Sequence, residues 1–340
     1  MNIFLLFFIA AFISSILALL IRRYALTHDQ RLIDVPNLRS SHSVPTPQGG
    51  GLAFVISFLL SVPILTVMSD LSWPEVWAFL GGGILVAMIG FSDDHGHVAI
   101  GWRLLAHLIG GTWTLFWLGG CPPLSILGFI IEPSLLSNIL AVFYLTWLLN
   151  LYNFMDGIDG LSTIETMTVC IGAALLIAPQ STSQSIWVTP LVLVASVSGF
   201  LFWNFPSAKI FMGDTGSSFL GLILGIFSIQ TAWVLPHMFW AWIILLGVFI
   251  VDATLTLLRR LSNREKFYKP HNKHIYQIAA RHYNSHKAVT LSIGLINLIW
   301  LLPIAYLASN QWVDGLLAVA IAYTPLVGLF FYFYGRQPEK

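Results

Sequence analysis

Charged side chains are scarce in this chain: Asp, Glu, Lys and Arg make up only 9% of its 340 residues. A soluble domain carries about 25%, so this chain lacks the charge that a water-facing surface of its size needs. Its net charge of +1 at pH 7 also lacks the positive field by which proteins bind nucleic acid. These shortages exclude a soluble cytosolic enzyme, and they exclude nucleic acid as a partner.

Cysteine is equally scarce, with only Cys121 and Cys170 in the whole sequence. One lies in a loop between apolar runs and the other lies inside such a run, so we expect no disulfide between them. Both are expected to be inert packing residues. The fold therefore has to be held together without a disulfide framework.

Long apolar runs are what the chain has instead, and 57% of its residues are hydrophobic. A bilayer core about 30 Å thick is crossed by roughly 20 apolar helical residues, and the runs are continuously apolar rather than alternating, which excludes spanning strands. The sequence therefore predicts an all-α integral membrane protein, a single polytopic domain over residues 1–340 with about eleven transmembrane helices. The expected spans lie near 3–21, 51–68, 76–92, 103–119, 135–152, 161–178, 186–203, 217–234, 238–258, 288–308 and 313–334.

The basic residues predict the orientation of these spans. Arg22 and Arg23 follow the first run and no basic residue precedes it, which predicts an N-terminus outside and a C-terminus in the cytoplasm. All 16 Lys and Arg residues then fall in cytoplasmic segments or at the adjoining helix ends. Because those segments are also the long and polar ones, we expect the active site on the cytoplasmic loops. The segments are 22–50, 92–102, 152–160, 204–216, 259–287 and the tail from 335.

Five aspartates stand at the inner ends of apolar runs: Asp93, Asp94, Asp156, Asp159 and Asp214. A carboxylate at that depth is costly unless it is paired or bound to a metal. Asp159 and Asp214 precede helices and could simply cap them, but the first two close a helix at the end where negative charge is disfavoured. Together the five predict a site for a hard cation with oxygen ligands, most plausibly Mg²⁺, with Mn²⁺ as a substitute.

Two further polar segments suggest phosphate binding. The run Gln48-Gly49-Gly50-Gly51 opens a helix, where free backbone N–H groups can face an anion, although such glycines also serve as ordinary helix punctuation. The long basic loop 259–287 would attract lipid headgroups, and its His and Asn residues within 269–277 favour a more specific anion contact. Carboxylates with Mg²⁺ beside anion-binding segments at a membrane surface fit phosphoryl transfer between a soluble nucleotide and a lipid.

Ordered motifs extend this interpretation to a family. They are His42 with Pro45-Thr46-Pro47-Gln48-Gly49-Gly50-Gly51, Gly90-Phe91-Ser92-Asp93-Asp94, Asn153-Phe154-Met155-Asp156-Gly157-Ile158-Asp159-Gly160, Asn204-Phe205-Pro206, and Phe211-Met212-Gly213-Asp214-Thr215-Gly216-Ser217. With the basic, His-containing loop, they make the chain resemble the polyprenyl-phosphate N-acetylhexosamine-1-phosphate transferase superfamily over nearly its whole length. Members of that superfamily are membrane enzymes that start bacterial cell-envelope glycans.

The resemblance implies a reaction in the bacterial inner membrane, in which undecaprenyl phosphate attacks the β-phosphate of a UDP-activated N-acetylated sugar and UMP is released. The resemblance is also compatible with a homodimer. It also implies roles for particular residues. Catalytic roles fall to Asp93, Asp94 and Asp159, Mg²⁺ ligation to Asp156 and Asp214, and substrate binding to His42, Gly50, Arg103, Asn153, Asn204, Phe211, His271, Lys273 and His274.

The basic loop departs from the commonest pattern of that superfamily. Many members carry a His-x-His-His cluster, whereas this chain reads His274-Ile275-Tyr276-Gln277. That variant resembles the branch that initiates O-antigen with 6-deoxy sugars such as N-acetylfucosamine. Two alternatives stay open at this point: an initiating transferase specific for UDP-GlcNAc, and a membrane transporter with intramembrane acids.

Overall fold

The computed structural model describes residues 2–36, 42–96, 98–265 and 271–335, and helices dominate them. Four short strands occur in the described residues, as two antiparallel pairs: β1 (Ile33–Asp34) with β2 (Thr46–Pro47), and β3 (Leu124–Ile126) with β4 (Phe129–Ile131). The predicted all-α class is confirmed. In chain order the α-helices are α1 (Ile3–Thr27), α2 (Leu52–Met68), α3 (Trp73–Trp77), α4 (Gly83–His95), α5 (Ile100–Trp117), α6 (Leu135–Met155), α7 (Leu161–Ile177), α8 (Ser185–Asn204), α9 (Gly213–Val234), α10 (Met238–Leu245), α11 (Gly247–Ser262), α12 (Ile275–Tyr283), α13 (His286–Ile296), α14 (Leu302–Ser309) and α15 (Gly315–Tyr334).

Each of the eleven expected runs is helical, although three of them are segmented. A π-helical turn, Ala78–Gly82, joins α3 to α4, a second one, Asn297–Leu301, joins α13 to α14, and α10 meets α11 at a bend of 67°. Within the described residues, seven helical stretches are long and apolar enough to cross a membrane, and the bent pair makes an eighth if it is one span. The chain is therefore a multi-pass membrane protein, while the count of eleven spans and their orientation stay predictions.

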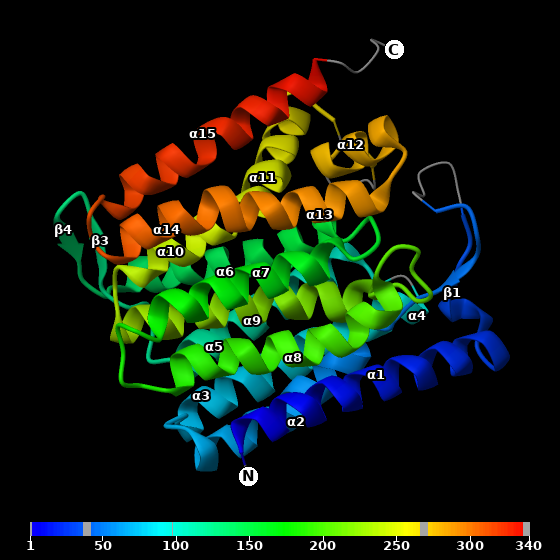
Figure 1. Cartoon of the computed structure of the whole chain (residues 1–340), viewed down its shortest axis with the longest axis horizontal. Coiled ribbons are helices and arrows are strands. Elements are labelled where there is room, and N and C mark those ends of the chain that lie inside the picture. The colour runs from blue at the N-terminus through cyan, green and yellow to red at the C-terminus, as the bar shows by residue number, and fades with distance from the viewer. Residues whose placement is uncertain (1, 37–41, 97, 266–270, 336–340) are drawn as a thin grey trace.

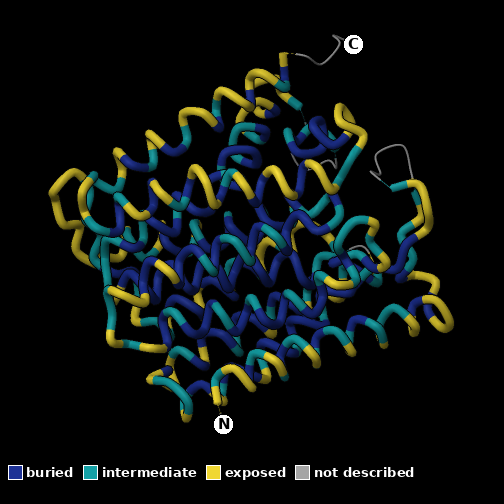
Figure 2. Tube along the Cα trace, in the orientation of Figure 1, coloured by how far each residue is buried: buried dark blue, intermediate teal, exposed yellow. Residues whose placement is uncertain are grey.

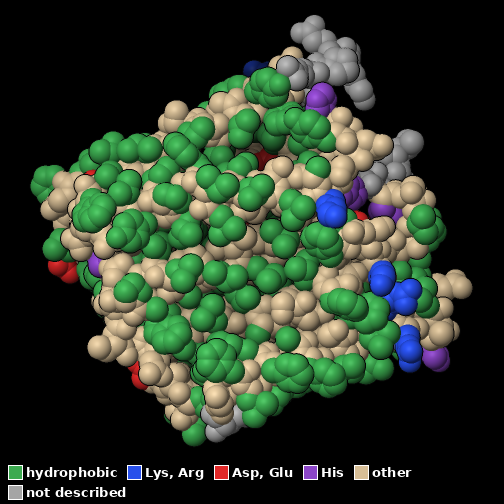
Figure 3. Space-filling model, in the orientation of Figure 1, with side chains coloured by type: hydrophobic (Ala, Val, Ile, Leu, Met, Phe, Trp, Pro, Cys, Tyr) green, Lys and Arg blue, Asp and Glu red, His purple; other side chains and the backbone are tan. Residues whose placement is uncertain are grey.

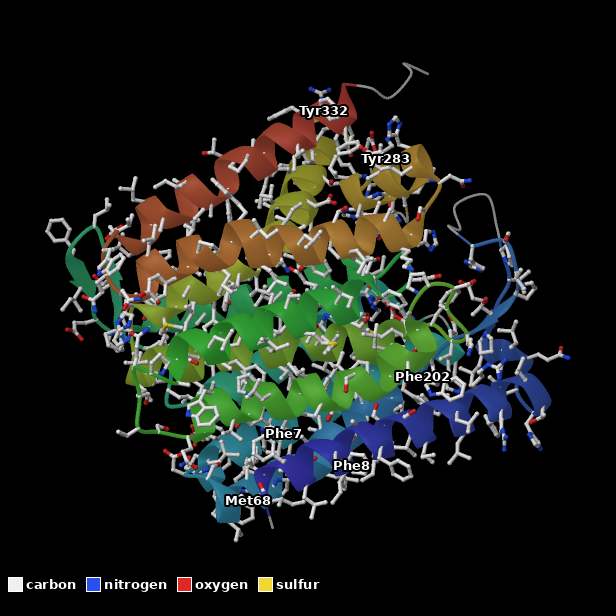
Figure 4. All side chains as sticks on the ribbon, in the orientation of Figure 1. Phe7, Phe8, Met68, Phe202, Tyr283 and Tyr332 are labelled. Carbon is white, nitrogen blue, oxygen red and sulfur yellow. The ribbon has the colours of Figure 1, made fainter. Side chains whose placement is uncertain are left out.

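Large apolar side chains cover the outside of the bundle, as a lipid environment requires. Phe8 on α1 and Phe202 on α8 are 68% and 69% exposed, and Figure 4 shows both on the outer helices, with Tyr283 and Tyr332 at the opposite edge. Hydrophobic side chains are spread over the whole face seen in Figure 3. A soluble monomer rarely exposes such an area, whereas in a bilayer these side chains contact lipid tails.

Helix α9 runs through the interior of the bundle. Every residue from Thr215 to Ala232 is buried, which Figure 2 shows as the dark centre of the molecule, and a helix that is apolar on all sides belongs in such a position. Helices α4 and α6 pack against it. A Cβ added at Gly221 would lie 2.4 Å from the carbonyl oxygen of Leu148 on α6, so this glycine permits the close approach. The first turn of α9, which carries Asp214, is therefore fixed by the core.

Several polar loops meet at one end of the bundle. The ends of α4, α6 and α8, the start of α9, the β1–β2 pair and α12 all lie at the right of Figure 1. The Lys and Arg side chains visible in Figure 3 gather toward the same end. This end is the one that the sequence assigns to the cytoplasm.

Candidate active site

A polar cavity of about 270 Å³ opens at this end of the bundle, and it brings together residues from five of the predicted motifs. Six of the predicted site residues do not line this cavity: Gly50, Asp93, Arg103, His271, Lys273 and His274. The predicted residues that line the cavity are His42, Asp94, Asn153, Asp156, Asp159, Asn204, Phe211 and Asp214. Asp34 and His286 also line it and were not expected, because each lies in a polar segment without any distinguishing spacing.

Asp94 caps the N-terminus of α9 from the end of a different helix, α4. Its Oδ1 accepts the backbone N–H of Asp214 at 2.7 Å, and its Oδ2 accepts the backbone N–H and the hydroxyl of Thr215 at 3.1 and 2.6 Å. Gly213 makes the approach possible, since its φ is +77° and an added Cβ would lie 2.7 Å from both carboxylate oxygens. The expectation that Asp94 needs a cation, because it ends its own helix, is corrected: the helix dipole it serves is that of α9.

Arg103 lies between Asp93 and Asp214. Its Nη1 is 2.5 Å from Oδ2 of Asp93 and 3.1 Å from Oδ2 of Asp214, and Asp93 also accepts the backbone N–H of Val98 at 2.8 Å. The structure thus gives Arg103 two carboxylate partners, and its predicted substrate-binding role stays a prediction. Its guanidinium neutralises two partly buried carboxylates at the edge of the cavity.

Asn204 ties together two loops that line the cavity. Its Oδ1 accepts the backbone N–H of Gly160 at 3.0 Å, and its Nδ2 donates to the carbonyl of Ile210 at 3.0 Å. Gly160 has a φ of +73°, a backbone conformation that suits glycine. Asn204 thus holds the loop after α6 against the loop before α9, while Asn153 donates to the Ser217 hydroxyl at 3.3 Å across the cavity.

An aromatic pair forms another part of the wall. The rings of His42 and Phe211 meet edge to face, with centroids 4.9 Å apart and planes at 66°. Nε2 of His42 lies 3.8 Å from Oδ2 of Asp34. The Phe211 ring is half-buried, and it offers the cavity a flat apolar surface beside hydrogen-bonding groups.

The glycine run before α2 has a packing role. The backbone N–H groups of Gly50 and Gly51 donate to the carbonyls of Phe211 and Met212 at 2.9 and 2.8 Å, so the expectation that they face an anion is corrected. A Cβ added at Gly50 would lie 2.7 Å from the Phe200 ring, and one at Gly51 would lie 2.5 Å from Cα of Gly216. These glycines let α2 approach the start of α9.

The basic loop is held away from the cavity, as far as the structure describes it; residues 266–270 lie outside the described part. Lys273 pairs with Glu265 at 2.6 Å, and His274 places its Nδ1 3.2 Å from Oδ1 of Asp252. Burial lowers the pKa of His271 to about 4, so that ring, stacked 4.8 Å from His274, is neutral at pH 7. The structure does not bring these three predicted contacts into the cavity.

Asp252 explains the position of α12 instead. Its carboxylate accepts the backbone N–H groups of Ile275 and Tyr276, both at 3.0 Å. The Tyr276 hydroxyl donates to the carbonyl of Phe154 at 3.0 Å. These bonds dock α12 on α11 and on the last turn of α6, and Gln277 from α12 lines the cavity.

The carboxyl group of Asp156 titrates in an unusual range. Burial, together with the carboxylates of Asp94 and Asp159, raises its pKa from 3.8 to about 7. Between pH 4 and pH 7 the folded state therefore holds a proton that the unfolded chain releases, so this group lowers stability as the pH rises through that window.

We expect Asp156→Asn, in EDTA, to melt at a higher temperature than the natural chain, with a difference that grows from pH 5 to pH 7 and is constant above about pH 8.

Differential scanning fluorimetry of the two proteins across this pH range measures the difference. Since the other titrating groups are shared, they cancel in the comparison. A difference that does not change with pH would contradict the raised pKa.

The donor set fits Mg²⁺ rather than a closed structural metal site. No group of three or more His, Cys, Asp or Glu side chains is arranged to hold a metal in the part of the chain that the structure describes. Mg²⁺ is usually bound through one or two carboxylates plus substrate phosphates and waters. Asp156 and Asp214 supply two carboxylates to one cavity, which meets that requirement.

Comparison with known proteins agrees with this arrangement. Residues 76–232 match the profile of glycosyl transferase family 4. The chain is 30% identical over 316 residues to a probable undecaprenyl-phosphate N-acetylglucosaminyl 1-phosphate transferase of Bacillus subtilis, covering 86% of this chain and 82% of the relative.

Two further relatives carry related names. A decaprenyl-phosphate N-acetylglucosaminephosphotransferase of Mycobacterium leprae is 28% identical over 76% of this chain and 73% of its own length. A phospho-N-acetylmuramoyl-pentapeptide-transferase of Streptococcus pneumoniae is 27% identical over 77% of this chain and 80% of its own length. On these similarities, which run through most of both chains, this protein belongs to the polyprenyl-phosphate N-acetylhexosamine-1-phosphate transferase superfamily.

Proposed function

We propose that this chain transfers the sugar-1-phosphate of a UDP-N-acetylhexosamine to undecaprenyl phosphate and releases UMP. The coarser activity follows from the family: the chain is an enzyme that transfers a sugar phosphate to a polyprenyl phosphate carrier. The finer proposal adds the UDP-linked donor, the undecaprenyl carrier and the bacterial inner membrane. It also adds initiation of O-antigen or a related cell-envelope polysaccharide.

One observation carries the proposal: a polar cavity lined by five carboxylates lies at the end of an apolar bundle, and they belong to Asp34, Asp94, Asp156, Asp159 and Asp214. A water-soluble nucleotide can enter such a cavity from the aqueous side, while the isoprenoid chain of the carrier stays in the surrounding lipid. The two reactants are both anionic and repel each other, so a cation held in this cavity would favour their approach.

Asp156 and Asp214 are the residues that would hold Mg²⁺, and Mn²⁺ shares the preference for oxygen ligands. When bound, the ion would offset the negative charge of the diphosphate. Asn153 and Ser217 present neutral polar groups to the same cavity. The Phe211 ring, backed by His42, is suited to stack on the pyrimidine base, and Asn204 fixes the loops on either side of it.

The chemical step needs one bond to form and one to break. An oxygen of the lipid phosphate attacks the β-phosphorus of the donor, and the bond from that phosphorus to the bridging oxygen breaks, so UMP leaves with that oxygen. The second pKa of a phosphate monoester is near 6, so the nucleophile is already ionised at neutral pH. We therefore assign Asp93 and Asp94, whose oxygens accept protein donors, to positioning rather than to proton removal.

The two alternatives differ in what supports them. A transporter receives no support from the family, and the cavity carboxylates gather at one end of the bundle rather than near its middle. N-acetylglucosamine is the sugar named for the Bacillus and Mycobacterium relatives, which favours UDP-GlcNAc as the donor. The His274-Ile275-Tyr276-Gln277 variant favours a 6-deoxy donor instead. The donor therefore has to be decided by assay.

We expect purified protein, with undecaprenyl phosphate and Mg²⁺, to release UMP from at least one of UDP-GlcNAc, UDP-GalNAc and UDP-N-acetylfucosamine. We expect N-acetylfucosamine to be preferred, and EDTA to abolish release until Mg²⁺ is restored. Release from UDP-GlcNAc alone would keep the reaction and overturn the 6-deoxy donor. No release from any donor would overturn the proposed function.

A further inference from the structure

Asp159 and His286 stand between two cavities. They line the main cavity of about 270 Å³, and they also line a second one of about 410 Å³. These two residues are the members shared by both linings. The other walls of the second cavity come from the α8–α9 loop, the end of α12 with Arg281, the turn that follows it, and the start of α13 with Lys287.

Two residues of helix α13 hold Asp159. Nδ1 of His286, the first residue of α13, lies 3.3 Å from Oδ1 of Asp159 and 3.5 Å from the backbone nitrogen of Asp159, whose N–H donates to it. The Thr290 hydroxyl, one turn later, donates to the Asp159 carbonyl at 2.9 Å. The second carboxylate oxygen accepts the backbone N–H of Ala208 at 3.0 Å. The side chains of Asp159 and His286 are only 12% and 19% exposed, so the contact between them is largely shielded from water.

We propose that His286 is a positioning residue for the nucleotide donor, because it fixes the direction of the Asp159 carboxylate. The inference rests on the proposed function. A carboxylate offers only hydrogen-bond acceptors. Held in the direction that His286 fixes, the Asp159 carboxylate accepts N–H or O–H groups of the UDP-sugar in the main cavity. Without His286, the two cationic side chains of the second cavity would draw the carboxylate toward themselves, away from the donor.

The fold does not depend on this contact alone. The Thr290 and Ala208 bonds stay when the imidazole is removed, and Ser285 still caps α13 by accepting the backbone N–H of Ala288 at 3.2 Å. Loss of His286 should therefore alter donor recognition while the protein stays folded. That separation distinguishes a positioning role from a structural one.

The test compares steady-state kinetics and UMP binding of full-length variants in detergent. For His286→Ala we expect the donor KM and the Kd of UMP to rise roughly 10-fold or more, as hydrogen bonds to charged groups predict. We expect kcat to stay within about threefold, and the KM of undecaprenyl phosphate to stay unchanged. His286→Asn should restore the donor KM to within about threefold, since its amide, close to the place of Nδ1, can both donate to the Asp159 carboxylate and accept the Asp159 backbone N–H.

His282→Ala is the matched control, because His282 packs against Tyr283, its neighbour on α12, and against Phe333 on α15. It should behave like the natural chain. A donor KM unchanged in His286→Ala would overturn the inference, and so would an Asn variant as impaired as the Ala variant. A fall in kcat at constant KM would also overturn it, since it would place His286 in the chemical step. Absence of turnover in the natural chain would instead sink the proposed function, and the inference with it.

Discussion

Replacing Asp214 by Asn should lower the rate of UMP release by about 10³-fold or more while the protein stays folded. Asp214 opens α9 and lines the cavity, and it is one of the two carboxylates that would anchor the cation. The amide keeps the shape of the side chain but removes its charge, and preorganised electrostatic groups at such sites contribute roughly 10²–10³-fold or more to the rate. The rate of UMP release at saturating Mg²⁺ measures the loss, and the melting temperature reports on the fold.

Asp314→Asn provides a matched control for this change. Asp314 also begins a helix, α15, and its side chain accepts the backbone N–H of Leu316 at 3.0 Å, yet it lies outside the cavity lining. This control should keep full activity. Full activity in Asp214→Asn would remove Asp214 from the site.

Replacing Asp94 by Ala should destabilise the protein as well as inactivate it. The change removes the acceptor for two backbone N–H groups and one hydroxyl at the start of α9, and the two donors of Thr215 are buried. Leaving them unpaired costs about 3 kcal/mol or more. Because Asp214 sits in the same turn, we expect UMP release to fall at least about 10²-fold, together with a clear drop in melting temperature.

The comparison variant is Asp314→Ala, which removes the N-terminal cap of a different helix, α15. It should lose about 1 kcal/mol and keep its activity. If Asp94→Ala melts like the natural chain but releases no UMP, then Asp94 acts in the chemistry itself, and its role as the cap of α9 would be wrong.

Local sequence signals were enough to predict the helices and the gathering of the carboxylates. A continuous apolar run of about 20 residues has few alternatives in a bilayer, so each predicted run became a helix. Asp156, Asp159 and Asp214 follow or precede such runs, and their common depth predicts that they meet, as the cavity lining confirms.

The partners of those carboxylates could not be predicted in the same way. Asp94 accepts from residues 120 and 121 positions later, and the Asp159–His286 pair spans 127 positions. The charge at a helix end says that a partner is needed, but it does not say which helix supplies it. The prediction that the backbone N–H of Gly50 faces an anion was wrong for a related reason. A glycine before a helix can leave room for an anion or for a tightly packed neighbouring side chain, and the sequence does not distinguish the two.

The most direct test of the central claim follows both parts of the donor. UDP-N-acetylhexosamine labelled with ³²P at the β-phosphate and with ³H in the sugar would be incubated with the purified chain, Mg²⁺ and undecaprenyl phosphate. The account predicts that both labels enter the lipid fraction in equal amounts and that unlabelled UMP is released. Transfer of ³H alone, with ³²P retained in soluble UDP, would contradict it, because the chain would then transfer a sugar and not a sugar phosphate.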